Sequence, residues 1–277
     1  MRKWRGKAVL AIAMSLATSA WAQSGPWPGG QKAAIALTYD DALPSQLDIA
    51  IPQLEAVGFK GTFFLIGREI KGNLARWQAV AAKGFELGNH SVTHACPKAL
   101  FEMPPQYMSE NSSVPVQLTE IQTMNNMLQA MDGRSDHPYA TPCGQTLAGG
   151  QDYLPALRTA GLTRYVRAAS EPATPAQAID PFNVPSHFFG VGDSGDKMIA
   201  YVESVRKRGG VAVIGFHGVG GDYLEVTAEA HRQLLAYLKA HESEIWVGTF
   251  THVMDRAQGK RPTQVGMAPT VCDSSNC

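Results

Sequence analysis

Two adjacent carboxylates, Asp40 and Asp41, follow the apolar run 33–37 and offer the chemistry of a metal ligand or a proton acceptor. The run is short and is bounded by Gly29-Gly30 and by Pro44, which predicts a strand buried on both faces. Successive strand residues face opposite ways, so both carboxylates can enter one pocket only if the strand ends there and the chain turns. The alternative is that they are solvated turn or helix-capping residues, as most Asp pairs are.

Two imidazoles four residues apart, His90 and His94, follow a later apolar segment. One turn of chain can aim both rings at a single ion, and a carboxylate from another strand end would complete three ligands. Catalytic zinc sites have this composition, with the remaining position left to water. Two histidines at this spacing could equally be surface or hydrogen-bonded residues.

A third histidine, His217, ends the most apolar run of the chain, 211–216, and precedes the glycine-rich segment 218–221. A lone histidine at the end of an apolar strand is often a structural residue. Here it falls on the same predicted sheet edge as the two carboxylates and the histidine pair.

The elements that must position these residues alternate between strand and helix. Apolar patterns and glycine or proline boundaries predict strands at 33–37, 61–67, 85–90, 163–167, 211–216 and 246–250. They predict helices at 45–57, 74–83, 117–131, 153–160, 197–207 and 227–241. This order implies parallel strands joined by right-handed crossovers, in a closed barrel or an open doubly wound sheet. In both folds, functional residues gather at the carboxyl ends of the strands.

Four short motifs together resemble those of the polysaccharide deacetylases, metal-dependent hydrolases that remove acetyl groups from chitin, peptidoglycan or xylan. The motifs occur in the same order along most of the chain: Thr38-Tyr39-Asp40-Asp41, His90-Ser91-Val92-Thr93-His94, Pro142-Cys143-Gly144 and Phe216-His217. The resemblance implies an α/β fold, a distorted and incomplete β/α barrel.

The resemblance also implies a role for each matched residue. Asp41, His90 and His94 would bind a divalent metal ion, most often Zn²⁺ in this family. Asp40 would be the general base and His217 the general acid. The amide of Cys143, after Pro142, would stand where the family has its oxyanion donor.

The chain departs from the family pattern in two places. Ala140 occupies the position of an arginine that orients the catalytic aspartate, and Arg134, Arg164 and Arg167 are the candidates to replace it. No segment matches the family's Asp and Trp motif that tunes the acid. Asp180 is the nearest candidate for the aspartate of this motif, and we expect that it does not play this role.

Several other residues could contribute to substrate binding. Tyr223 follows the glycine-rich segment and could line the site, and Phe101, Met103 and Tyr107 lie in the long loop 95–116. For each of them, packing within its own loop is the alternative.

The N-terminus has the pattern of a bacterial secretory signal. Four basic residues precede an apolar run from Ala8 to Ala20, which is shorter than the roughly 20 residues needed to span a bilayer. We expect cleavage after Ala22, which would make the protein periplasmic or secreted with no stable membrane anchor. An uncleaved anchor is the alternative. The remaining chain would carry 20 basic against 24 acidic side chains, which argues against a nucleic-acid partner.

Four cysteines, Cys96, Cys143, Cys272 and Cys277, form an even set in a chain expected to be exported, so disulfides are permitted. We favour Cys96–Cys143 and Cys272–Cys277 among three pairings, because the first two flank candidate site motifs and the others share a polar tail. Free thiols are the alternative.

These observations predict a signal peptide (1–22), a catalytic domain (23–257) and a polar tail (258–277). The function that the resemblance implies is deacetylation of a sugar polymer or oligomer, at N-acetyl groups of chitin or peptidoglycan or O-acetyl groups of xylan. Two other functions remain open: a carbohydrate-binding protein of the same fold with impaired catalysis, and an amidohydrolase acting on small non-sugar amides.

Overall fold

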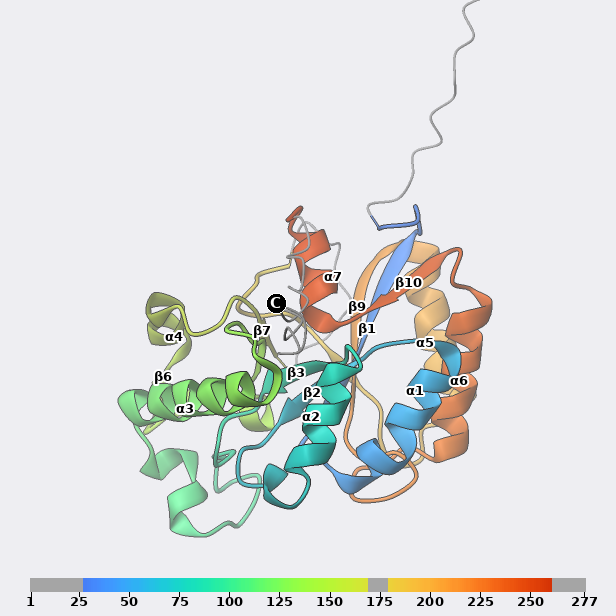
Figure 1. Cartoon of the computed structure of the whole chain (residues 1–277). Coiled ribbons are helices and arrows are strands. Elements are labelled where there is room, and N and C mark those ends of the chain that lie inside the picture. Colours follow the sequence, from blue (N-terminus) through green and yellow to red (C-terminus); the bar gives the residue numbers. More distant parts are fainter. Residues whose placement is uncertain (1–26, 169–178, 261–277) are drawn as a thin grey trace, which may run out of the picture.

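A single parallel sheet forms the centre of the computed structural model, which describes residues 27–168 and 179–260. Its strands are β1 (Ala33–Asp40), β2 (Thr62–Leu65), β3 (Glu86–Asn89), β4 (Tyr139–Ala140), β7 (Val166–Arg167), β8 (His187–Phe188), β9 (Gly210–Phe216) and β10 (Ile245–Gly248). The strand order is β7-β4-β3-β2-β1-β9-β8. β9 pairs along one side of β1, whereas β10 and β2 share the other side. The sheet curves into a half-barrel, as the family resemblance implied (Figure 1).

Within residues 27–168 and 179–260, seven α-helices accompany this sheet. Figure 1 shows how they are arranged around it. They are α1 (Ile51–Val57), α2 (Leu74–Ala82), α3 (Val114–Asp132), α4 (Leu154–Ala160), α5 (Gly195–Arg208), α6 (Ala228–Ala240) and α7 (Phe250–Ala257). Shorter helical segments are η1 (Gln46–Ala50), η2 (Ile70–Gly72), η3 (Pro105–Tyr107), η4 (Ser109–Asn111) and η5 (Pro142–Gly144). A small hairpin pairs β5 (Leu147–Ala148) with β6 (Gln151–Asp152).

The two faces of β1 belong to two different cores. Ile35, Leu37 and Tyr39 pack in the larger core, to which α1, α2, α3, α5 and α6 contribute. Ala34 and Ala36 point the other way and pack with α7. Because strand side chains alternate, the small alanines leave room for α7 inside the half-barrel. β1 is thereby buried on both faces, as its uninterrupted apolar run predicted.

Most predicted elements are present with small changes at their ends. Pro52 lies in the first turn of α1, after η1, and Gly58 ends α1 in the left-handed conformation. The strand predicted at 246–250 was wrong at its end, since β10 stops at Gly248 and α7 begins at Phe250. The strand predicted at 163–167 is reduced to β7. β4, β8, the hairpin and α7 were not predicted. The strands among them are only two residues long, which is too short to show a periodic pattern.

Some sequence predictions fall outside the described residues. These are the signal segment 1–22 with its cleavage after Ala22, the Cys272–Cys277 pair, and the tail beyond residue 260. Within the described ranges, no helix combines the length and the apolar character needed to cross a bilayer.

Candidate active site

The chain turns sharply after β1, so both carboxylates reach the same pocket. Asp40 is the last residue of β1, and Asp41 and Ala42 then adopt positive φ angles of 80° and 60°. The amide of Asp41 donates to the Phe64 carbonyl at 3.0 Å, which joins the turn to β2. The two aspartates are only 2% and 5% exposed. This is the turn that the sequence required if both side chains were to share one site.

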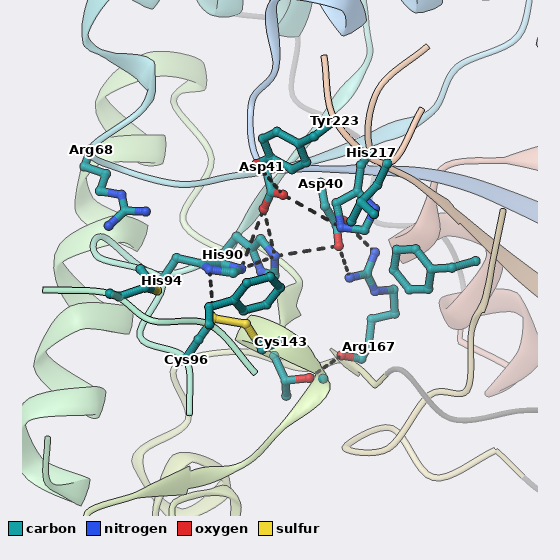
Figure 2. A pocket seen from close by; sticks show the side chains of 16 residues that line it. Asp40, Asp41, Arg68, His90, His94, Cys96, Cys143, Arg167, His217 and Tyr223 are labelled. Carbon is teal, nitrogen blue, oxygen red and sulfur yellow. Dashed lines mark hydrogen bonds and ion pairs between the residues drawn. A yellow bond between two sulfur atoms is a disulfide. The ribbon is translucent and has the colours of Figure 1, made fainter. Parts of the chain in front are cut away.

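His90 and His94 converge on Asp41 from the loop that follows β3 (Figure 2). Their Nε2 atoms lie 3.1 Å apart, and they are 3.5 Å and 3.6 Å from Asp41 Oδ1. The other ring nitrogen of His90, Nδ1, lies 2.9 Å from the Ala140 carbonyl. A proton on Nδ1 satisfies that carbonyl and leaves a lone pair on Nε2, the arrangement that a metal-binding histidine needs.

Asp41 Oδ1 is buried and has no hydrogen-bond partner among the described residues. A buried carboxylate oxygen without a donor is costly, and a cation among these three side chains would satisfy it. The ligand atoms of Asp41, His90 and His94 all lie within 4.8 Å of one another. One carboxylate and two imidazoles suit Zn²⁺ and similar divalent ions, so the three residues fit the metal that the family resemblance implied.

The two histidines are held in the form that binds metal. Burial lowers the pKa of His90 to about 4, even though Asp40 and Asp41 act in the opposite direction. Burial also lowers the pKa of His94 to about 4. Both imidazoles are therefore neutral at neutral pH, with a lone pair available.

The disulfide predicted between Cys96 and Cys143 is confirmed, with Cα atoms 5.7 Å apart. Together with His94, these two cysteines form a second cluster of possible metal ligands. Because the sulfurs are bonded to each other, they offer no thiolates, and the cluster is not a metal site in this state.

Arg167 holds Asp40 through two hydrogen bonds, from Nη1 to Oδ1 at 2.7 Å and from Nη2 to Oδ2 at 2.5 Å. Both side chains are 3% exposed, and the guanidinium lies between the rings of Phe64 and Phe188. Burial acts to raise the pKa of Asp40, but the charge and hydrogen bonds of Arg167, aided by His90, lower it to about 2. Asp40 is therefore ionised across the usual pH range.

Arg167 thus makes the pairing with an aspartate that the family resemblance implied for an arginine at position 140. In the parallel register of β4 and β7, Ala140 pairs directly with Arg167, so the guanidinium comes from the neighbouring strand at the same level. The other candidates lie elsewhere: Arg134 faces Glu86, and Arg164 pairs with Asp136 and Asp255.

His217 and Tyr223 approach Asp41 from the loop after β9. His217 Nε2 lies 3.8 Å from Asp41 Oδ2, and the Tyr223 hydroxyl donates to the same oxygen at 2.8 Å. Burial and the negative charge of Asp41 raise the pKa of Tyr223, so the hydroxyl keeps its proton. Tyr223, a candidate to line the site and bind substrate, does line the cavity, and its hydroxyl is hydrogen-bonded to Asp41.

Cys143 lies in a tight turn beside the histidines. Its φ angle is +53°, and the amides of Gly144 and Gln145 bond back to Thr141 and Pro142 within the turn. No acceptor among the described residues takes the Cys143 amide proton. This amide is consequently free to donate to a ligand in the cavity that Cys143 lines.

The candidate site residues line a cavity of about 630 Å³. They are Asp40, Asp41, His90, His94, Cys143, Arg167, His217 and Tyr223 (Figure 2). Its apolar lining includes Phe101, Met103, Phe188 and Leu224, and Arg68 adds a cation at one side. Tyr107, the third loop residue singled out in the sequence, is not among the lining residues and instead lies under the Arg68 guanidinium. Asp180 pairs with Arg158 in a different, exposed groove, as expected for a residue outside the site.

Comparison with known proteins gives one family and several similar structures. Residues 29–165 match the sequence profile described as polysaccharide deacetylase. A bifunctional xylanase/deacetylase of Pseudobutyrivibrio xylanivorans is 37% identical over 90 residues, which are 32% of this chain and 15% of that protein. This chain therefore corresponds to a small part of the curated relative.

Two solved structures are similar in fold. A Mycobacterium smegmatis protein, provisionally named a polysaccharide deacetylase, superposes with a TM-score of 0.61 and 18% identity, covering 87% of this chain and 96% of its own. A family 4 acetyl xylan esterase from Clostridium thermocellum, solved with a cobalt ion, has a TM-score of 0.51 and 19% identity, covering 82% and 93%. The matched profile includes Asp40, Asp41 and the histidine pair, and the half-barrel that carries them is shared. The chain belongs to the polysaccharide deacetylase family.

Proposed function

We propose that this chain is an exported, metal-dependent deacetylase that hydrolyses acetyl groups of a polysaccharide or oligosaccharide. The observation that carries the proposal is the unsatisfied Asp41 Oδ1 facing two neutral histidines, next to a second carboxylate held ionised by Arg167. Metal-assisted hydrolysis requires one carboxylate that binds the cation and a second that accepts a proton from water.

The residues divide the reaction between them. A divalent ion held by Asp41, His90 and His94, with Zn²⁺ as our first choice, would polarise the acetyl carbonyl and lower the pKa of water. Asp40 accepts a proton from the attacking water. His217 donates a proton to the departing nitrogen or oxygen, and the bond from that atom to the acetyl carbon breaks to give acetate.

The amide of Cys143 supplies the remaining stabilisation. A backbone N–H aimed at the developing oxyanion acts without reorganisation and is worth several kcal/mol at such sites, about 3 in known cases. Pro142 precedes it in the turn and restricts the backbone through its fixed φ angle.

We place catalysis within residues 23–257 and assign residues 1–22 to export, with the periplasm or the exterior as the destination. Fractionation of cells expressing the full chain tests the export. Recovery of full-length protein in the cytoplasm alone would contradict it.

The reaction is tested by acetate release from acetylated xylan, chitooligosaccharides and peptidoglycan. Each assay is run with Zn²⁺, after chelation and after metal is restored, with Asp40→Asn as the matched inactive variant. We expect release from at least one carbohydrate, lost with the metal and recovered with it. The curated relative's name includes xylanase and deacetylase, which makes acetylated xylan the first substrate to try.

The assay also separates the two alternatives. Carbohydrate binding without acetate release would favour a binding protein, and release only from small amides would favour an amidohydrolase. Impaired catalysis would be expected if the alanine at position 140 left Asp40 without an arginine partner. The pairing of Arg167 with Asp40 therefore favours the enzyme over the binding protein.

A further inference from the structure

We propose that the Cys96–Cys143 disulfide is a positioning device of the active site, which ties the ligand His94 to the amide donor Cys143. Cation affinity and turnover then both depend on the disulfide being oxidised. The turnover part rests on the proposed function, whereas the cation part rests only on the three-ligand geometry.

The disulfide joins two loops that are distant in sequence. Cys96 is two residues after His94, in the loop that follows β3, and Cys143 lies in η5, after β4. The sequence separation is 47 residues, and Cys96 is 1% exposed. One covalent bond therefore connects the cation ligand to the candidate oxyanion donor (Figure 2).

Both loops carry unfavourable backbone geometry close to this bond. His94 and Cys143 each have a φ angle of +53°, and Ser91, at the start of the histidine loop, has +60°. Residues with a Cβ avoid this region, and such conformations persist only where the surrounding structure imposes them. A cross-link between the two loops is a constraint of that kind.

The rings of the two histidines are supported differently. His90 Nδ1 lies 2.9 Å from the Ala140 carbonyl, a strong acceptor on β4. His94 Nδ1 instead faces Cys96 Sγ at 3.4 Å. Metal-binding histidines depend on the partner of their second nitrogen for ring orientation, and a sulfur is a weak acceptor. His94 is thus the ligand whose orientation relies on the disulfide.

Reduction supplies a direct way to remove the constraint. A phosphine cleaves the S–S bond and gives two thiols, while the phosphine takes an oxygen atom from water and becomes its oxide. The two protons on the thiols come from the same water molecule, so the step is balanced. Once the sulfurs separate, the His94 loop and the Cys143 turn are free to move independently.

Three samples test the proposal: the oxidised protein, the same protein after reduction with a phosphine, and the double variant Cys96→Ser/Cys143→Ser. Affinity for Zn²⁺ and Co²⁺ is measured by competition with a chromophoric chelator, without substrate. We expect binding 10- to 100-fold weaker in both samples that lack the disulfide, the range seen when outer-shell partners of metal ligands are removed. The phosphine should not affect the double variant, which is the control for side effects of the reagent.

Turnover provides a second readout. With cation saturating, we expect kcat for a small acetyl ester to fall at least tenfold without the disulfide and KM to change less, since the amide donor acts in the transition state. Circular dichroism and thermal melting establish that each sample is folded at the assay temperature. If the double variant does not fold, the cation affinity and kcat of the reduced, still folded wild-type protein test the proposal.

Two results would overturn the proposal. One is cation affinity within threefold of the oxidised protein in the double variant or the folded reduced protein. The other is tighter binding after reduction, which would mean that the freed thiols and His94 form a better site than Asp41, His90 and His94. Absence of acetyl release from every sample would count against the proposed function only, because the cation titrations would still test the disulfide.

Discussion

Arg167 binds both carboxylate oxygens of Asp40 from a strand position that pairs directly with Ala140. This chain has alanine where the family resemblance implied an arginine, and the arginine that pairs with Asp40 comes from the adjacent strand. The planar guanidinium matches a carboxylate through two parallel hydrogen bonds, which fixes the position of Asp40 as well as its charge.

Replacing this arginine should change both the rate and its pH dependence. We expect Arg167→Lys to lower kcat/KM at least tenfold, because lysine keeps the charge and loses the two-point contact. Arg167→Ala should lower it further and move the acid limb of the profile to higher pH, because burial then raises the pKa of Asp40 from about 2. The measurement is kcat/KM from pH 4 to 9, with Arg134→Lys as the matched control. An unchanged acid limb in Arg167→Ala would show that Asp40 does not set it.

The two adjacent carboxylates should respond differently to the same change. Asp40→Asn should reduce turnover at least a hundredfold, since it removes the proposed proton acceptor, and leave the metal content near that of the wild-type protein. Asp41→Asn should lose metal, because it weakens the charged ligand of the site. Metal content is measured on purified proteins after exchange into metal-free buffer. Loss of metal from Asp40→Asn would instead identify Asp40 as a metal ligand and contradict the roles proposed for the two aspartates.

The hydroxyl of Tyr223 should matter for metal binding although it is not a ligand. It donates to Asp41 Oδ2 and so directs the other oxygen, Oδ1, toward the histidines. We expect Tyr223→Phe to weaken Zn²⁺ binding about tenfold, since partners of ligating carboxylates have effects of this size. Leu224→Ala, on the same loop, should bind Zn²⁺ as the wild-type protein does. If Tyr223→Phe and Leu224→Ala bound Zn²⁺ with equal affinity, the Tyr223 hydroxyl would have no part in metal binding, and only a contact with substrate would remain for it.

The stability of the fold should fall on acidification because of His231. This buried ring lies 2.7 Å from the Tyr39 hydroxyl and 2.7 Å from Gln53 Oε1, and burial lowers its pKa to about 3. The unfolded chain takes up a proton near pH 6.5 whereas the folded chain does not, so stability falls as pH decreases from about 6.5 toward about 3.

Urea denaturation between pH 7.5 and 4 measures this effect, on the order of a few kcal/mol. His231→Phe should be less stable than wild type at pH 7, since two polar partners lose their hydrogen bonds. It should also lose less stability on acidification, because one buried titrating group is gone. If the free energy of unfolding depended on pH in the same way in both proteins, His231 would be excluded as a source of the acid destabilisation.

The local part of the site was predictable from the sequence. The end of the strand at Asp40, the two histidines four residues apart and the histidine at the end of 211–216 are patterns within short segments. Side-chain alternation and the position of apolar runs depend on neighbouring residues, so they can be read without knowing the fold.

Which distant residues meet was decided only by the tertiary structure. Three arginines were candidates to replace the missing one, and the choice of Arg167 depends on β7 lying next to β4. Likewise, the hydroxyl of Tyr223 reaches Asp41, and Cys96 Sγ lies beside the ring of His94, because separate loops meet above one sheet edge. Order along the chain does not specify the order of strands in a sheet, and the burial that neutralises the histidines and the charge that ionises Asp40 exist only once those strands are assembled.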